Sequence, residues 1–356
     1  MQLFDTIADM GHEQLALCHD PAAGYRGIIA IHSTVLGPAL GGTRFWQYGS
    51  DEEAIVDALR LARGMTYKNA VAGLNLGGGK SVIIGDNKTA DRELIFRAHG
   101  RFVESLGGRY ITAEDVGTST ADMDYVHMET RNVTGLAGRS GDPSPVTAHG
   151  VFRAIQASAT DRWGSDDVAN RTVAMQGCGH VGFYLAKELH EAGAKLIVTD
   201  IDADRVKRVV KEFGAKPVKP DEIYGVKADI FAPCALGAII NDTTLPQLKV
   251  EIVAGAANNV LHEERHGDAL EKQKILYAPD YVANAGGVIN VYSELAGWTS
   301  ARSFRKADEI YDTVLKVFSI ARQDRVPTYV AADRLAEQRI KAVGSMVRTW
   351  PQWPNK

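Results

Sequence analysis

Two lysines and an aspartate in the first third of the sequence are the side chains best suited to chemistry. Lys68 lies near the end of a long apolar helix pattern, Lys80 begins an apolar strand pattern, and Asp115 follows another. A lysine that is desolvated beside a second cation has a lowered pKa, which is what a general base needs near neutral pH. Lys80 therefore suits a base, whereas a charged Lys68 could bind a carboxylate.

Each of these residues also has a simpler interpretation. Most lysines are solvated surface charges, but this interpretation is weak for Lys80, because a flexible run of three glycines precedes it and Val-Ile-Ile follows it. Asp115 could be the N-cap of the helix that follows it as readily as a catalytic carboxylate. The spacing alone does not separate these two roles.

A glycine-rich segment in the middle of the chain predicts a dinucleotide site. It lies between an apolar strand at 171–176 and a helix pattern. The first glycine permits a tight turn, the second lets a pyrophosphate approach, and the third lets the helix pack on the strand. The helix N-terminus then offers free N–H groups to the phosphates. The residues of this segment that we expect to contact the cofactor are Gly177, Gly179, His180, Val181 and Gly182.

A second strand, at 195–200, ends at Asp200, eighteen residues after the last of these glycines. A carboxylate there accepts hydrogen bonds from ribose hydroxyls and repels a 2′-phosphate, so the sequence predicts NAD rather than NADP. A chance match is the alternative in a chain with 35 glycines. A chance match is disfavoured because a strand, a helix, a second strand and a terminal aspartate follow one another at the expected spacings.

Composition narrows the class of protein. The chain has 356 residues, 45% hydrophobic and 24% charged, as in ordinary globular proteins, and its length favours two domains. A net charge of −4 argues against a nucleic-acid partner or a membrane surface. We find no secretion signal and no apolar run of membrane-spanning length. Three cysteines without metal-like spacing fit a reducing cytoplasm, so we expect a cytoplasmic protein without a metal site.

The pattern of the whole chain predicts an α/β fold. A turn-rich segment at 138–145 marks a boundary between a substrate-binding and oligomerisation domain (1–137) and a Rossmann-like NAD-binding domain (138–329) with a mostly parallel sheet. Residues 330–356, mainly a helix, would return to the first domain. Ligands of such sheets bind at the carboxyl ends of the strands, so we expect the active site in the cleft between the domains. Expected strands are 25–31, 44–48, 80–84, 109–112, 171–176, 195–200, 229–232, 251–254 and 275–278, and expected helices include 51–65, capped by Asp51, 91–106, 121–129 and 147–162.

Seven short segments distributed over nearly the whole chain have a distinctive composition. They are Pro38-Ala-Leu-Gly-Gly-Thr-Arg44, Gly64-Met-Thr-Tyr-Lys68, Gly77-Gly-Gly-Lys-Ser81, Thr112-Ala-Glu-Asp-Val-Gly117, Ala232-Pro-Cys-Ala-Leu-Gly237, Gly255-Ala-Ala-Asn-Asn259 and Ala283-Asn-Ala-Gly-Gly287. They resemble the motifs of the glutamate/leucine/phenylalanine/valine dehydrogenase superfamily, and those of its leucine dehydrogenases most closely. Two small departures are Gly182, where alanine is common, and Gly79-Lys-Ser, where Ala-Lys-Thr is common; both keep small residues.

The resemblance implies an NAD-dependent dehydrogenase that reversibly deaminates an L-amino acid. By matching positions, Lys80 would be the catalytic lysine that activates water, and Asp115 would exchange protons with the substrate amino group. Lys68 would bind the α-carboxylate. The other implied positions are Gly41 and Gly42 at the carboxylate site, Thr147 and Asn284 at the nicotinamide carboxamide, and Asn258 at the reacting centre.

The same resemblance indicates the substrate side chain. Glutamate-specific relatives carry a lysine where this chain has Leu40, so an acidic side chain would be left buried and unpaired. With Ala113, Val288 and Val291 at the other pocket positions, leucine, valine and isoleucine are favoured. The alternatives are a phenylalanine- or tryptophan-type dehydrogenase and, from another class, a non-catalytic nucleotide sensor on the same fold.

The family resemblance also implies a homo-oligomer associating through the first domain, with an octamer as the size known for leucine dehydrogenases. The sequence itself adds an apolar N-terminal strand and two tryptophans near the C-terminus, Trp350 and Trp353, which we interpret as a subunit contact.

Overall fold

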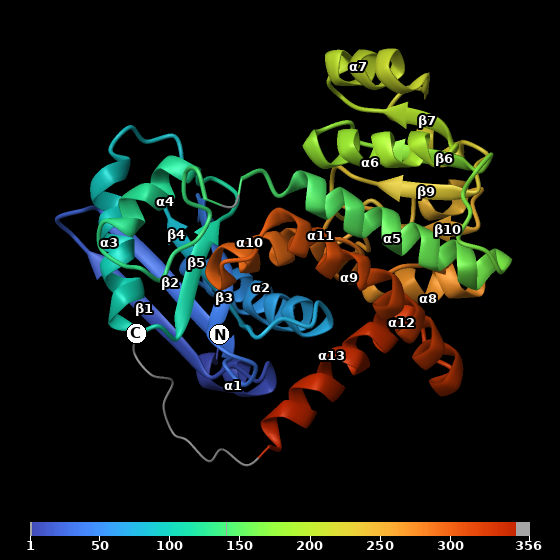
Figure 1. The fold of residues 1–356 in the computed structure, drawn as a ribbon. Helices are drawn as coiled ribbons and strands as arrows, with labels where there is room; N and C mark the ends of the chain where they lie inside the picture. Colours follow the sequence, from blue (N-terminus) through green and yellow to red (C-terminus); the bar gives the residue numbers. More distant parts are fainter. Residues whose placement is uncertain (1, 140, 347–356) are drawn as a thin grey trace. The chain divides into compact units, whose positions relative to one another are not determined.

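The computed structural model describes residues 2–139 and 141–346, so Trp350 and Trp353 lie outside the described residues. The chain divides into two compact units, Met1–Val133 with Ala336–Lys356, and Thr134–Leu335. Each unit has its own sheet (Figure 1). None of the helices among the described residues is long and apolar enough to cross a membrane.

The first unit is built on a five-stranded sheet in the order β1-β2-β4-β3-β5. Strands β3, β4 and β5 run parallel, whereas β1 and β2 pair antiparallel. Among the described residues of this unit, four helices accompany the sheet, and the end of α13 joins them. The elements are α1 (Leu3–Asp9), β1 (Gln14–Asp20), β2 (Tyr25–Ser33), β3 (Ala39–Trp46), α2 (Asp51–Val71), β4 (Gly77–Ile84), α3 (Arg92–Ser105), β5 (Tyr110–Glu114) and α4 (Thr120–His127).

Two glycine-rich stretches are strands rather than loops, which corrects the sequence prediction. β3 begins at Ala39, not at residue 44, and Gly77 to Gly79 form the start of β4 rather than a flexible run. Neighbouring chain leaves these glycines no room for a side chain: a Cβ on Gly77 would lie 1.9 Å from the Ser33 carbonyl oxygen. Glycine has a low strand propensity, so the sequence pattern did not indicate a strand at 39–43 or at 77–79.

Helix α2 covers one face of this sheet through small side chains. Ala54, Ala58 and Ala62 of the helix pack with Ala30 of β2 and Val82 of β4 in one buried cluster. The helix begins with Ser50 as its N-cap, whose Oγ accepts a hydrogen bond from the Glu53 N–H at 3.2 Å. Asp51 was therefore the wrong cap residue, by one position.

The second unit contains a six-stranded parallel sheet in the order β8-β7-β6-β9-β10-β11. This is the doubly wound order of dinucleotide-binding folds, and it confirms the predicted parallel sheet. The strands are β6 (Thr172–Gln176), β7 (Lys195–Thr199), β8 (Lys216–Pro217), β9 (Ile230–Pro233), β10 (Ile252–Val253) and β11 (Leu276–Tyr277), and two 3₁₀ turns are η1 (Ile223–Gly225) and η2 (Leu245–Gln247).

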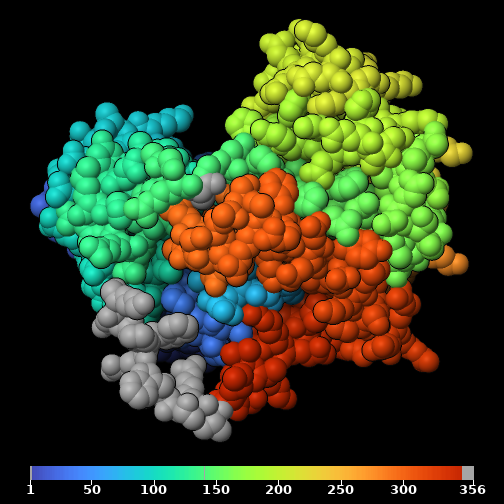
Figure 2. Space-filling view, in the orientation of Figure 1, coloured from blue at the N-terminus to red at the C-terminus, as the bar shows by residue number. Residues whose placement is uncertain are grey.

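Helices flank this second sheet. Of the residues in α7 only Val209 is buried, so the helix forms part of the surface of its unit, where its side chains stand out in the space-filling view (Figure 2). The helices are α5 (Ser144–Trp163), α6 (His180–Glu191), α7 (Ala203–Phe213), α8 (Glu264–Lys272), α9 (Asp280–Ala283), α10 (Gly286–Ala296), α11 (Ser300–Asp308), α12 (Ile310–Asp324) and α13 (Thr328–Gly344). Helix α13 begins in the second unit, and its later residues belong to the first, where the Arg339 guanidinium donates to backbone carbonyls at the end of α2.

Candidate functional site

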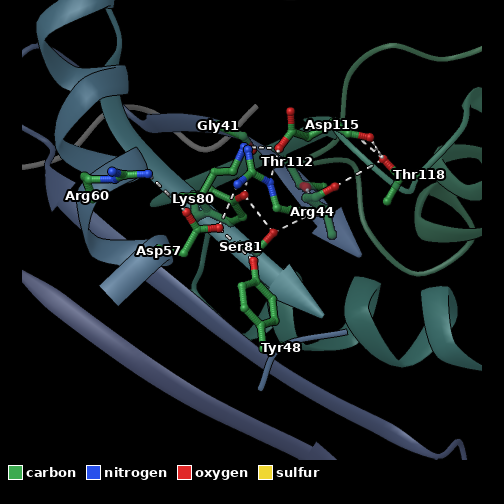
Figure 3. Close-up of polar contacts among 12 residues, drawn as sticks. Gly41, Arg44, Tyr48, Asp57, Arg60, Lys80, Ser81, Thr112, Asp115 and Thr118 are labelled. Carbon is green, nitrogen blue, oxygen red and sulfur yellow. Dashed lines mark hydrogen bonds and ion pairs between the residues drawn. The ribbon is translucent and has the colours of Figure 1, made fainter. Parts of the chain in front are cut away.

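Lys80, which is buried, and Asp115, which is partly buried, form an ion pair in the first unit (Figure 3). Lys80 lies in the middle of β4 with only 6% of its side chain exposed, and its Nζ donates to Asp115 Oδ2 at 2.6 Å. Asp115 follows β5 directly. Because β3 lies between β4 and β5 and runs parallel to both, the two charged groups reach each other across one strand.

The structure shows that Asp115 is not the N-cap of the helix that follows it, a role that the sequence left open. The N-cap of α4 is Ser119, in a capping box with Asp122. The Asp115 backbone N–H donates to Thr118 Oγ1 at 2.9 Å, and that hydroxyl donates in turn to the Thr43 carbonyl of β3 at 3.1 Å. The loop after β5 is thus fixed to β3 with the Asp115 carboxylate turned toward Lys80.

Burial and the neighbouring charges shift the pKa values of both groups. Loss of hydration lowers the pKa of Lys80, an effect that Asp115 opposes and Arg44 adds to. Burial alone would raise the pKa of Asp115, but Lys80 and Arg44 together hold it below its usual range. A lysine with a lowered pKa beside an ionised carboxylate can exchange a proton near neutral pH, as acid–base catalysis requires.

Glycines let the strands approach this pair closely. A Cβ on Gly41 would lie 1.7 Å from the Gly79 carbonyl oxygen, and one on Gly42 would lie 2.3 Å from the Glu114 carbonyl oxygen and 2.9 Å from Asp115 Cβ. Both positions predicted at the carboxylate site therefore lie against the strands that carry the ion pair. Any side chain there would displace Asp115 or the backbone beside Lys80.

On the opposite face of the sheet, hydrogen bonds between polar side chains connect strands β3, β4 and β5. Side chains alternate along a strand, so Thr43, Ser81 and Thr112 point away from Lys80 and toward α3. Thr43 Oγ1 lies 2.7 Å from Ser81 Oγ, 2.5 Å from Thr112 Oγ1 and 2.9 Å from His99 Nε2. Burial lowers the pKa of His99 to about 3, so this histidine is neutral at physiological pH and completes an uncharged network.

The remaining predicted substrate residues are divided between the units. Lys68 is partly buried in the last turn of α2. Leu40 and Ala113 are buried on β3 and β5, on the face that α2 covers. Val288 and Val291 lie in α10 of the second unit, three residues apart and therefore on one face of that helix.

Each glycine of the 177–182 segment has a distinct steric environment. Gly177 has φ +104°, and a Cβ on Gly182 would lie 2.1 Å from the Gly177 carbonyl oxygen. At Gly179, the N-cap of α6, the nearest atom to such a Cβ is a side-chain nitrogen of Arg205 at 3.7 Å. The first and third glycines are required by the protein itself, whereas the second leaves the open approach that a pyrophosphate needs.

The other predicted cofactor residues fit NAD as well. Asp200 follows β7; its Oδ2 accepts from the Cys178 N–H at 2.7 Å, a bond that ties it to the glycine segment. His180 and Val181 begin α6, with His180 exposed. A carboxylate has about four acceptor sites, so two hydroxyls of a ribose could still bind Asp200.

A second group of polar side chains gathers where α5, α9 and the segment after β10 meet. Asn284 donates through Nδ2 to Asn258 Oδ1 at 2.8 Å, and a Cβ on Gly287 would lie 3.3 Å from Thr147 Oγ1. The Asn284 Oδ1 atom is buried without a hydrogen-bond partner among the described residues. Buried acceptors are nearly always satisfied, and the amide N–H₂ of a nicotinamide is a donor of the right kind for this one.

Arg44, Asp57 and Tyr48 were not among the predicted site residues. Arg44 Nε lies 3.2 Å from Asp115 Oδ2 and its Nη1 lies 2.8 Å from Asp57 Oδ2, which also accepts from the Tyr48 hydroxyl at 2.7 Å. The sequence did contain a signal that Arg44 belongs to the site, because this charged residue ends one of the quoted motifs and stands between apolar or small residues of a strand. Asp57 and Tyr48 give no such signal.

Comparisons with known proteins match both units. The family model "Glu/Leu/Phe/Val dehydrogenase, dimerisation domain" matches residues 12–132, and "Glutamate/Leucine/Phenylalanine/Valine dehydrogenase" matches residues 198–343. A leucine dehydrogenase of Geobacillus stearothermophilus is 59% identical over 96% of this chain and 94% of its own length. One from Thermoactinomyces intermedius is 58% identical over 99% and 97%. The crystal structure of L-tryptophan dehydrogenase from Nostoc punctiforme superposes with a TM-score of 0.88 at 47% identity, over 96% of this chain and 99% of that one.

Proposed function

The chain belongs to the glutamate/leucine/phenylalanine/valine dehydrogenase family, and we propose that it catalyses the reversible NAD-dependent oxidative deamination of leucine, valine and isoleucine to 2-oxo acids and ammonia. The observation that carries this proposal is the ion pair between the buried Lys80 and Asp115, which a nucleotide sensor would not need. Its cysteine content supports a cytoplasmic location. The test is product analysis: ammonia, 2-oxo acid and NADH should form from L-leucine in equal amounts.

The proposed chemistry assigns one task to each polar group. NAD, when bound, accepts the hydride from the substrate Cα. Lys68 holds the α-carboxylate as a fixed cation. The ionised Asp115 first accepts a proton from the substrate ammonium group, which frees the nitrogen lone pair for hydride loss from Cα. Neutral Lys80 takes a proton from the water that adds to the resulting imine. Asp115 then returns its proton to the nitrogen, which leaves as ammonia. The lowered pKa of Lys80 makes its neutral form accessible, so the rate of deamination should rise as the pH rises above 7.

Residues of the second unit would hold NAD. Gly179 and the N-terminus of α6 would face the pyrophosphate, and Asp200 would accept from the adenosine ribose. Asn284 and Thr147 would bind the nicotinamide carboxamide. The Asn284 Oδ1 atom, which is buried and has no hydrogen-bond partner in the described part of the chain, supports this assignment most directly.

Cofactor preference should depend on Asp200. We expect NAD to exceed NADP in catalytic efficiency, and Asp200→Ser to narrow the gap about tenfold or more, since a like-charge contact costs ~1–4 kcal/mol in screened surroundings. Initial rates at limiting cofactor would measure this. Asp204→Ser is the matched control, because Asp204 is exposed on α7 in an ion pair with Lys207 and should leave the ratio unchanged. Equal efficiencies for both cofactors in the unaltered enzyme would refute the role of Asp200.

The pocket side chains predict how substrate choice can be changed. Val291→Ala should raise activity on phenylalanine and tryptophan and lower it on leucine, because it removes two methyl groups from the pocket and a change of one methylene already alters discrimination by ~1–3 kcal/mol. The ratio of kcat/KM values for phenylalanine and leucine is the measurement. An unchanged ratio would remove Val291 from the pocket.

We further propose that the chain forms a homo-oligomer, with an octamer as the expected size, through its first unit. Support comes from the exposed apolar side chains Phe4 and Leu17, 84% and 65% exposed, the second of them on the edge strand β1. Light scattering should give several times the mass of one chain, and Leu17→Lys should reduce it. Leu94→Lys, at an exposed position of α3, is the control. A single-chain mass for the unaltered protein would contradict the proposal.

A further inference from the structure

The Arg44 guanidinium connects the ion pair to a second carboxylate (Figure 3). Its Nε shares Asp115 Oδ2 with Lys80, at 3.2 Å and 2.6 Å respectively, while its Nη1 binds Asp57 Oδ2 at 2.8 Å. Arg44 extends from β3, Asp115 from the loop after β5, and Asp57 from α2. One side chain thus spans three elements at the point where the proposed acid–base chemistry occurs.

Asp57 is itself held in place. Its Oδ2 accepts from the Tyr48 hydroxyl at 2.7 Å, its Oδ1 lies 3.8 Å from a guanidinium nitrogen of Arg60, and only 15% of its side chain is exposed. Asp57 therefore anchors Arg44 from the side opposite to Asp115. The charged and titratable groups that face this cluster are Lys80, Asp115, Asp57, Tyr48 and Arg60.

The proposed reaction requires Lys80 to lose its charge. A neutral Lys80 no longer balances Asp115, and a largely buried carboxylate without a counter-charge takes up a proton. A second lysine at position 44 could also lose its proton in such a site. An arginine cannot, because its guanidinium stays charged at every working pH.

We propose that Arg44, anchored by Asp57, is a positioning residue that holds Asp115 as an aligned carboxylate while Lys80 cycles between its charged and neutral forms. The inference rests on the proposed deamination. The directions of the pKa shifts agree with it: the Arg44 charge lowers the pKa of both Lys80 and Asp115. The same cation thus favours the base form of one partner and the ionised form of the other.

The test is the pH dependence of leucine deamination in Arg44→Met, Arg44→Lys and Asp57→Asn. Arg44→Met should lower kcat about 10–100-fold through misplacement of Asp115. It should also move the rising limb of the kcat/KM profile upward by about one pH unit, since Lys80 loses a cationic neighbour. Arg44→Lys should restore part of kcat and keep the limb near its original pH. Asp57→Asn removes an anion instead, so it should lower kcat without moving the limb upward.

Arg26→Met is the matched control, because Arg26 forms an exposed ion pair with Asp51 on the same unit. NAD affinity should be unchanged in all four variants. An unshifted limb in folded Arg44→Met, or equal losses in Arg44→Met and Arg44→Lys, would overturn the proposal. If Arg44→Met does not fold, an unaltered kcat in Asp57→Asn would overturn it. Inactivity of the unaltered enzyme on every amino acid would instead refute the proposed function.

Discussion

Replacing Lys80 by alanine should reduce the rate of leucine deamination ~10²–10⁴-fold, the usual cost of losing a general acid–base group. Lys80 is buried against Asp115, and no other described lysine or histidine is paired with that carboxylate. NAD affinity should survive, because the residues proposed to bind NAD belong to the second unit. Steady-state rates and cofactor titration would measure the two quantities separately.

Lys207→Ala serves as the control for this variant. Lys207 is an exposed lysine of α7 in an ion pair with Asp204, so its loss should leave turnover unchanged. Turnover of Lys80→Ala close to that of the unaltered enzyme would exclude Lys80 as the base.

Asp115→Asn should cause a loss of the same order, ~10²–10⁴-fold, because an amide keeps the shape of the carboxylate but cannot exchange the proton. Residues that act as one unit have non-additive effects, so the double variant with Lys80→Ala should be little worse than either single variant. Glu114→Gln, at the neighbouring exposed position of β5, is the control. Losses that multiply in the double variant would show that the two residues act independently.

The dinucleotide-binding half of the molecule was predictable because its signals are local. Gly177, Gly179 and Gly182 lie within six residues, and the strand before them and Asp200 after them follow at fixed spacings. The parallel sheet was predictable for the same reason, since apolar strands alternate with helices along the sequence. The structure confirms it. The hydrogen bond from Cys178 to Asp200 and the short strand β8 could not be read from the spacing.

The first unit was harder to predict because its constraints come from residues far apart in the sequence. Gly41 must be small because of Gly79, and Gly77 because of Ser33, so these glycines belong to strands that local propensity does not indicate. The family resemblance, which the comparisons confirm, is what placed Lys80 and Asp115 together before the structure did.

Arg44 shows the limit of sequence reasoning most clearly. Its two partners, Asp57 and Asp115, are 13 and 71 residues away and lie on different elements. No periodicity or motif connects them. The strand order, with β3 next to β5, brings Arg44 to Asp115, and the packing of α2 on the sheet brings Asp57 to Arg44.

The most direct test of the central proposal is the catalytic efficiency of the unaltered enzyme with NAD on six amino acids: leucine, valine, isoleucine, phenylalanine, tryptophan and glutamate. With Leu40 and Ala113 buried and apolar, we expect kcat/KM, followed as NADH formation, to be highest for one of the first three and lowest for glutamate. A highest value for glutamate or for an aromatic amino acid would contradict the proposed substrate, and no NADH from any of the six would contradict the proposed reaction.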